Sequence, residues 1–228
     1  MTTLAELRAT VRTSIPNLTV WPDTLLDVWI KAGIGHYSER FPRLWMNSIT
    51  AVADTQSYDL PANATSIETV EFPAGEDPAS YLLAVNRVDS RMLIGDDVYA
   101  ITGTDDGETA VQNGRLTIAP VVAGGETLTI GYRAPHPAPV NDESVITVPD
   151  QHMGILVQYC SWSAYQAQLA AEVAEPYRNM NLVGQLTKAV ESAWSILDDL
   201  MAGVTVLETA VTSSSVVVWD NENTERIY

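Results

Sequence analysis

The spacing of apolar residues predicts a short helix over residues 2–14. Its apolar stripe, with members three or four residues apart, comprises Leu4, Leu7 and Val11. Thr3 is followed three residues later by Glu6, a pattern typical of a capped helix start. The N-terminal segment is therefore expected to bury one face against the rest of the protein.

A second helix is predicted between Pro22 and Pro42. Its apolar stripe comprises Leu25, Trp29, Ala32 and His36, with Leu26, Gly33 and Tyr37 beside it. Glycine inside a helix costs about 1 kcal/mol relative to alanine, and this helix contains Gly33 and Gly35. We therefore expect it to pack closely against a neighbouring helix or chain.

The pattern changes to short strands between residues 47 and 148. Segments with strand character, separated by Pro, Gly, Asn and Asp, are Ser48–Ala53, Ser66–Phe72, Val98–Thr102, Arg115–Ala119 and Thr127–Arg133. In the last segment Leu128, Ile130 and Tyr132 alternate with Thr or Gly, which predicts one buried face. These features predict an inserted antiparallel β-domain.

Helical spacing returns after Pro149, first over Asp150–Ala174 and then, beyond Pro176, over residues 177–201. Residues of the last helix that recur at spacings of four and three are Val183, Thr187, Val190, Trp194, Leu197 and Met201. Such a heptad seam is typical of helix-helix contact. The expected helix-packing residues are Trp29, Val183, Val190, Trp194 and Leu197.

Residues 204–228 are expected to form an extended arm. Ser213–Ser215 is a flexible polar segment, and Val216, Val217, Val218 and Trp219 form an apolar cluster rich in β-branched residues. Pairing with the sheet edge of another protein would cover this cluster. We therefore interpret these side chains as partner-binding residues.

The expected fold class is α+β, a helical bundle with an inserted antiparallel β-domain. Residues 1–46 supply the N-terminal helices of the bundle and 47–148 form the β-domain. Residues 149–203 supply a C-terminal helical hairpin that completes the bundle, and 204–228 form the extended C-terminal arm.

The charge of the chain argues against tight binding to nucleic acid. Its 228 residues include 29 acidic and 12 basic side chains, giving a formal net charge of -17. No run of five Lys or Arg residues provides the positive surface that phosphate neutralisation requires. DNA next to such a protein is expected to pass without specific binding.

Targeting signals and reactive cysteines are also not expected. No segment reaches the roughly 18 uninterrupted apolar residues of a membrane span, and the N-terminus lacks signal-peptide features, which favours synthesis in the cytoplasm. Cys160 lies in an apolar run, so we expect an inert buried thiol.

No catalytic, metal or cofactor motif is found in the sequence. His36, His136 and His152 lack zinc-site spacing, and no phosphate-binding loop or GxSxG elbow occurs. We interpret His36 as a packed helix residue and His136 as a loop residue. The doublets Asp105-Asp106 and Asp198-Asp199 resemble paired carboxylates of glycoside hydrolases, but loops and outer helix faces usually leave such groups solvated.

Several short motifs occur in a characteristic order. They are Trp21-Pro22-Asp23 with Leu26, Arg40-Phe41-Pro42, the run Gln56–Pro61, the strand Gly114–Pro120, and Tyr132-Arg133 with Pro135. Placed between a helical pair and an Ala-rich helical hairpin, this order resembles the head-to-tail adaptor (connector) proteins of short-tailed bacteriophages. The resemblance covers nearly the whole chain.

The resemblance implies a structural virion protein at the head-tail interface. Its subunits would form a closed, dodecameric ring under the portal protein, extend the DNA channel and provide a docking platform for tail or nozzle proteins. The β-domain would project toward the tail and the arm would reach the portal. Because some members of the wider adaptor group carry cell-wall hydrolase activity, the alternative is a glycan-binding or glycan-hydrolysing tail protein.

Overall fold

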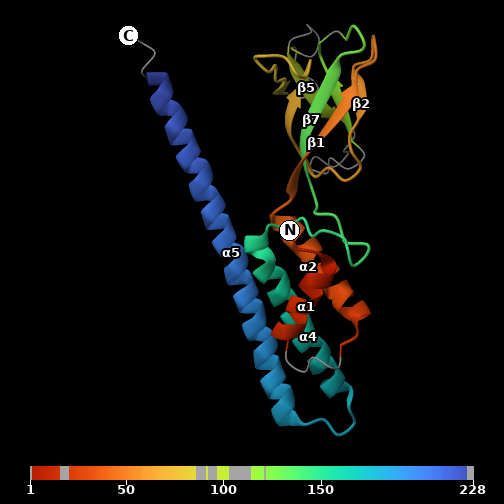
Figure 1. Ribbon diagram of the computed structural model, residues 1–228, viewed down its shortest axis with the longest axis vertical. Helices are drawn as coiled ribbons and strands as arrows, with labels where there is room; N and C mark the ends of the chain where they lie inside the picture. Colours follow the sequence, from red (N-terminus) through yellow and green to blue (C-terminus); the bar gives the residue numbers. More distant parts are fainter. Residues whose placement is uncertain are drawn as a thin grey trace. The chain divides into compact units, whose positions relative to one another are not determined.

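The protein consists of a helical unit and a β-unit (Figure 1). The computed structural model describes residues 2–15, 21–85, 91, 97–102, 114–120 and 122–224, without the side chains of 205–224. Met1–Tyr37 and Pro137–Tyr228 form the helical unit, and Ser38–His136 form the β-unit. The predicted α+β class, with a β region inserted between helical segments, is confirmed.

The helical unit begins with α1 (Leu4–Ser14), which has the predicted start and buried stripe. The Thr3 hydroxyl accepts a hydrogen bond from the Glu6 backbone N–H, and the Glu6 carboxylate accepts one from the Thr3 N–H. These reciprocal bonds satisfy donors that the first helical turn would leave unpaired. Leu4, Leu7 and Val11 are buried as predicted.

The second helix, α2 (Asp23–Arg40), buries a stripe next to the one that the sequence indicated. Its fully buried residues are Leu26, Ile30, Ile34 and Tyr37. Ala32, predicted on the buried stripe, is exposed, whereas Trp29 is buried at the edge. The buried face is rotated because Ile30 and Ile34 supply more apolar surface than Leu25 and Ala32.

The third helix, α4 (Met153–Ala174), follows the short 3-10 helix η1 (Asp150–His152). Among its 22 residues only Glu172 is charged, and the buried ones are Ile155, Leu156, Cys160, Ser161 and Ala164. A Cβ placed on Gly33 of α2 would lie 3.1 Å from the Tyr159 ring, which confirms the expected close packing at this glycine. A Cβ on Gly35 would meet no described atom within 4 Å beyond the adjoining backbone of α2.

The last helix, α5 (Met180–Thr224), packs antiparallel to α4 but in a different register from the predicted seam. Its buried residues are Ala193, Leu197, Met201 and Val204. Leu197 and Met201 were predicted correctly, but Thr187 is exposed and Trp194 is 43% exposed. Trp194, expected among the packing residues, contacts Trp162 of α4 but lies at the edge of the seam, because Ala193 occupies the buried position.

The backbone of 204–224 continues α5 as a helix, so the expected extended arm is wrong over these residues. Val216, Val217, Val218 and Trp219 belong to this helix and not to a strand. Adding a residue to an existing helix avoids the cost of nucleation, and β-branched residues cost only a few tenths of a kcal/mol each. After Gly203 no glycine or proline interrupts the sequence before residue 225.

The β-unit consists of two facing sheets within its described residues. One contains β1 (Arg43–Thr50), β7 (Thr127–Ala134) and β3 (Ser66–Glu71), in the order β1-β7-β3 and antiparallel throughout. The other contains β2 (Ser57–Asp59), β6 (Arg115–Ile118), β5 (Val98–Thr102) and β4 (Leu83–Ala84), in the order β2-β6-β5-β4. The β4-β5 pair is parallel, which departs from the predicted antiparallel arrangement.

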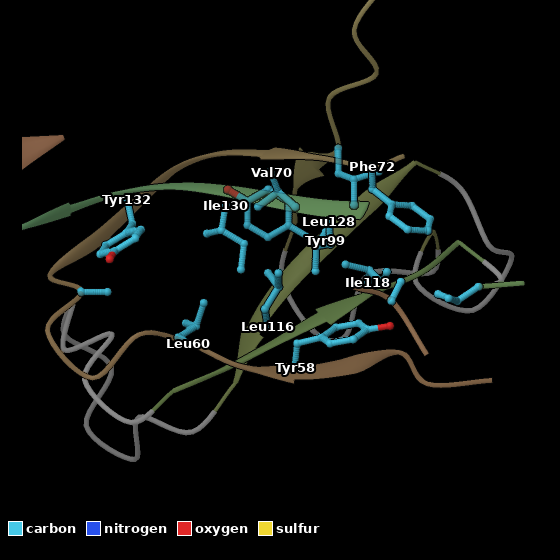
Figure 2. Packing of buried hydrophobic residues seen from close by; sticks show 14 of the residues in the cluster. Tyr58, Leu60, Val70, Phe72, Tyr99, Leu116, Ile118, Leu128, Ile130 and Tyr132 are labelled. Atoms are coloured by element: carbon cyan, nitrogen blue, oxygen red, sulfur yellow. The ribbon is translucent and has the colours of Figure 1, made fainter. Parts of the chain in front are cut away.

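An apolar core fills the space between the sheets. Figure 2 shows Val70, Leu128 and Ile130 of one sheet pointing toward Leu116 and Tyr58 of the other. The predicted buried alternation of β7 is confirmed, since Leu128, Ile130 and Tyr132 are all buried. Strand β1 begins at Arg43, four residues before the expected start of the β-domain.

Replacing Leu197 should destabilise the helical unit strongly. Leu197 is 1% exposed, and a Leu→Ala change at a buried site costs about 2–5 kcal/mol through lost burial and the cavity left behind. Urea unfolding of Leu197→Ala should show this loss in the free energy of unfolding. Leu200→Ala, a matched change at a position 42% exposed, should cost less than about 1 kcal/mol; equal losses would show that the register is different.

Candidate assembly site

An arginine fork holds α1 against its neighbours in the helical unit. Arg8 Nε donates to Asp27 Oδ1 of α2 at 2.8 Å, and an Arg8 terminal nitrogen donates to Asp142 Oδ1 at 2.7 Å. The Arg8 side chain is mostly buried, so losing either acceptor would leave a poorly solvated charge. The hydrogen bond to Asp142, with a further one to Asp27, raises the pKa of Arg8.

A second ion pair joins the end of α1 to the start of α2. Arg12 donates to the carboxylate of Asp23 and to the Trp21 carbonyl oxygen. The hydrogen bond from Arg12 lowers the pKa of Asp23 below its ordinary value of 3.8. Asp23 also lies in the first turn of α2, where a negative charge complements the helix dipole.

A groove runs along α4 and α5 on the side where α1 ends. It contains two hollows of about 340 and 380 Å³. The first is lined by Ser14, Gln158, Ser161, Tyr165, Ala189, Ser192, Ala193 and Ile196. The second is lined by Trp21, Gln168, Ala171, Glu172, Glu175, Leu182 and Leu186. We call this surface the α4-α5 groove.

The two walls of the α4-α5 groove differ in chemistry. The α4 wall is largely polar, with Gln158, Tyr165 and Gln168, and ends at the carboxylates of Glu172 and Glu175. The α5 wall is mostly apolar, with Leu182, Leu186, Ala189, Ala193 and Ile196 beside Ser192. The same heptad spacing continues to Leu200, beyond the hollows. Leu182, Ile196 and Leu200 are 38–47% exposed. This wall borders the seam that α4 covers and shares Ala193 with it.

On the other side of the helix pair, rings from three helices form an aromatic cluster. His36 of α2 lies 5.6 Å from Tyr159 and 5.8 Å from Trp194 between ring centroids. Trp162 of α4 lies 5.4 Å from Tyr159 and 5.0 Å from Trp194. His36 is therefore a packed helix residue, as predicted, and the aromatic contacts join α2, α4 and α5.

Two buried histidines have structural partners that the sequence did not indicate. The Tyr37 hydroxyl forms a 2.7 Å hydrogen bond with His152 Nδ1. His136 lies in a loop, as predicted, but it is buried: its backbone N–H donates to Ser38 Oγ, and its Nε2 lies 3.2 Å from the Phe41 carbonyl oxygen. A single sequence gives no signal for such contacts, because the partners are more than 90 residues apart.

The expected packing residues do not form one site. Trp29 is 9% exposed and contacts Trp21 edge to face, whereas Val183 and Val190 are half-buried on α5. Leu197 is buried between α4 and α5, and Trp194 belongs to the aromatic cluster. The side chains of Val216–Trp219 lie outside the described residues, so their proposed role in partner binding stays a prediction.

The described residues offer little for catalysis. No cluster of three or more His, Cys, Asp or Glu side chains able to hold a metal ion occurs among them. Burial raises the pKa of the Cys160 thiol to about 12, which keeps it protonated and unreactive. Asp198 and Asp199 are exposed on α5, and Asp105-Asp106 lies outside the described residues.

The β-unit exposes apolar side chains at one edge. Strand β1 is an edge of its sheet, and Leu44 and Met46 are 58% and 63% exposed on its outer face. The neighbouring part of the sheet is polar, with an Arg133–Glu68 ion pair of 2.7 Å. In natural proteins another segment usually covers an exposed edge strand, or charged residues protect it.

Over the part of the chain that the structure describes, no helix combines the length and apolar character that crossing a membrane requires.

Comparison with known protein families gives one match. Residues 2–205 match the family model described as SU10 adaptor protein. No curated protein matches the chain. The matched region includes the whole β-unit, helices α1, α2 and α4, and the part of α5 that packs on α4.

The Asp23–Arg12 pair should contribute stability that disappears in acid. Because the folded-state pKa of Asp23 is lowered, its contribution is present above the unfolded value of about 4 and is lost as pH falls through the folded value. Asp23→Asn should therefore lower the urea midpoint at pH 7, and this loss should shrink steadily as the pH falls below about 4. Asp199→Asn, at an exposed α5 position, should not change the midpoint. A pH-independent loss in Asp23→Asn would contradict the assignment.

Cys160 should be unreactive in the folded protein. Its thiol is fully buried, and its pKa of about 12 leaves almost no thiolate at pH 8. Iodoacetamide at pH 8 should label the unfolded chain at least a hundredfold faster than the native chain, as measured by mass spectrometry. Rapid native labelling would show that α4 is open at this position.

Proposed function

The chain belongs to the SU10 adaptor protein family, and we propose that it forms the ring that joins the portal of a bacteriophage head to the tail. Proteins of this family are structural adaptor proteins of bacteriophages. The match over residues 2–205 is the observation that carries the proposal, because it covers both units of the fold. The proposed location is the head-tail interface of the virion.

Ring formation requires each subunit to bury surface on two neighbours. The apolar wall of the α4-α5 groove supplies surface of the kind that helices bury on one another. A standard protein interface buries roughly 1,600 Å², of which apolar area contributes about 25 cal/mol per Å² before association entropy is subtracted. We propose that a dodecameric ring of this kind extends the DNA channel for genome ejection.

The net charge of the chain suits a channel that DNA must leave freely. A surplus of 17 negative charges per subunit repels the phosphate backbone wherever it lines the channel. Charges farther away than a Debye length of about 8 Å are screened at physiological salt. We therefore propose an acidic or neutral channel wall, through which DNA passes without specific binding.

The C-terminal half of α5 is the proposed portal-binding segment. It continues for 19 residues beyond the family match, which ends at residue 205. Helix α5 has 45 residues and α4 has 22, so α4 is too short to cover the C-terminal half. We propose that Val216, Val217, Val218 and Trp219 bind the portal as part of a helix, and that the β-unit faces the tail or nozzle protein.

Free subunits should stay monomeric and close into a ring only on a portal. Like charges on the subunits oppose association, and the portal supplies the symmetric template. Multi-angle light scattering of the purified protein at low salt should give the monomer mass. The same protein mixed with DNA-filled heads that carry the portal should sediment with them. A stable closed ring of free protein would contradict this order of assembly.

Removing the end of α5 should separate folding from attachment. Deleting residues 212–228 removes helical turns that lie beyond the reach of α4, so the melting temperature should change by less than about 2 °C. The truncated protein should fail to sediment with portal-bearing heads. If the truncated protein sedimented with these heads as well as the full chain does, the C-terminal half of α5 would not be the portal-binding segment.

A further inference from the structure

We propose that strand β1 of the β-unit binds an extended strand of the tail protein, which adds to the sheet beside β1. This inference rests on the proposed adaptor function, and it names the surface and the kind of partner segment. Strand β1 has eight residues and lies at one edge of the sheet β1-β7-β3. One side of its backbone therefore has no neighbouring strand among the described residues.

The register of β1 on β7 shows which backbone groups point away from the sheet. The Ala51 N–H donates to the Glu126 carbonyl oxygen at 2.8 Å, and such bonds recur at every second residue of an antiparallel pair. The β1 residues that bond to β7 are therefore Arg43, Trp45, Asn47 and Ile49. Those whose N–H and C=O groups point outward are Leu44, Met46, Ser48 and Thr50. A second extended backbone pairs with all of these groups at once.

Among the edge strands that the structure describes, β1 is the one without protection. Strands β2 and β4 have only three and two residues. Strand β3 has a bulge at Glu68, and the Leu82 N–H donates to its Val70 carbonyl oxygen at 2.8 Å. Strand β1 contains no proline or lysine, and no charged residue occurs from Leu44 to Ala53. Because short length, bulges, charges and cover are what keep edges from pairing, β1 stays able to pair.

The side chains along β1 favour a partner strand with alternating apolar residues. Leu44 and Met46 lie on the outer face and are 58% and 63% exposed. Apolar residues at every second position of an added strand would cover them. Arg43, the only charged residue of β1, lies 4.5 Å above the Trp45 ring. An acidic residue at that end of the partner strand would complement its charge.

The symmetry of the proposed ring argues against a second copy of this chain as the source of the strand. Two β1 edges that face each other are related by a two-fold axis, whereas neighbours in a ring of more than two copies are related by rotation about the ring axis. The other described edges are too short or too well covered to pair along eight residues. The portal is assigned to the C-terminal half of α5, so the partner of β1 is the tail protein.

Hydrogen exchange followed by mass spectrometry measures this pairing on the backbone itself. The peptide of residues 43–50 should exchange its outward amides quickly in the free subunit and in rings on DNA-filled heads without tails. Joining tails of the same phage to these heads should protect the outward amides of Leu44, Met46, Ser48 and Thr50. The peptide of residues 127–134, from the central strand β7, should be protected to the same degree in all three states and is the control.

A lysine substitution tests the same edge through a side chain. Leu44→Lys gives β1 the kind of residue that keeps natural edge strands from pairing. Leu83→Lys is the matched control, because it adds the same charge at a position 57% exposed on the two-residue strand β4. Both variants should melt within about 2 °C of the wild type, since both positions are exposed, and both should attach to portal-bearing heads. Heads with Leu44→Lys should join tails about tenfold less often in electron micrographs, whereas heads with Leu83→Lys should join them normally.

The outcomes separate this inference from the proposed function. If the wild-type chain does not attach to portal-bearing heads, the adaptor function and this contact both fail. If it attaches, but Leu44→Lys joins tails normally or the β1 amides stay unprotected in tailed particles, only the β1 contact is overturned. Protection of β1 already present in rings without tails would assign this edge to a neighbouring copy or to the portal, and would also overturn it.

Discussion

The need to cover an almost uncharged helix governs the helical unit. Helix α4 has one charged residue in 22 and buries Ile155, Leu156, Cys160, Ser161 and Ala164, so neighbouring helices must cover its apolar side. The unit meets this need with three neighbours, each held differently. Arg8 fixes α1 to α2 and to Asp142, Gly33 admits the Tyr159 ring between α2 and α4, and the Ala193–Leu197 face of α5 packs antiparallel to α4. Among the described residues, the hollows that remain beside these neighbours form the α4-α5 groove.

This constraint links folding to assembly. A subunit that covered α4 completely would have no reason to bind a second copy, whereas one with a large open apolar face would aggregate before reaching its portal. The groove is intermediate, because its α5 wall is apolar and its α4 wall is polar enough to stay in water. The β-unit does not take part in this balance, since a core that includes Val70, Leu116, Leu128 and Ile130 lies within its own sheets.

Local patterns predicted most elements but not how they pack. The Thr3–Glu6 cap and the alternation of Leu128, Ile130 and Tyr132 are encoded within a few residues, and both predictions are confirmed. Trp194 was misplaced because heptad spacing alone cannot distinguish a seam through Trp194 from one through Ala193. The arm was misassigned because β-branched residues favour strands only weakly, and a helix already nucleated on α4 extends through them. The groove depends on which helices become neighbours, so no single segment indicates it.

The most direct test of this account is a cryo-electron microscopy reconstruction of portal-bearing, DNA-filled heads with the chain bound, computed without imposed symmetry. The account predicts a closed ring of this chain beneath the portal, with the α4-α5 groove of every copy filled by its neighbour. Density for the chain elsewhere on the particle, or isolated copies whose grooves face solvent, would contradict it.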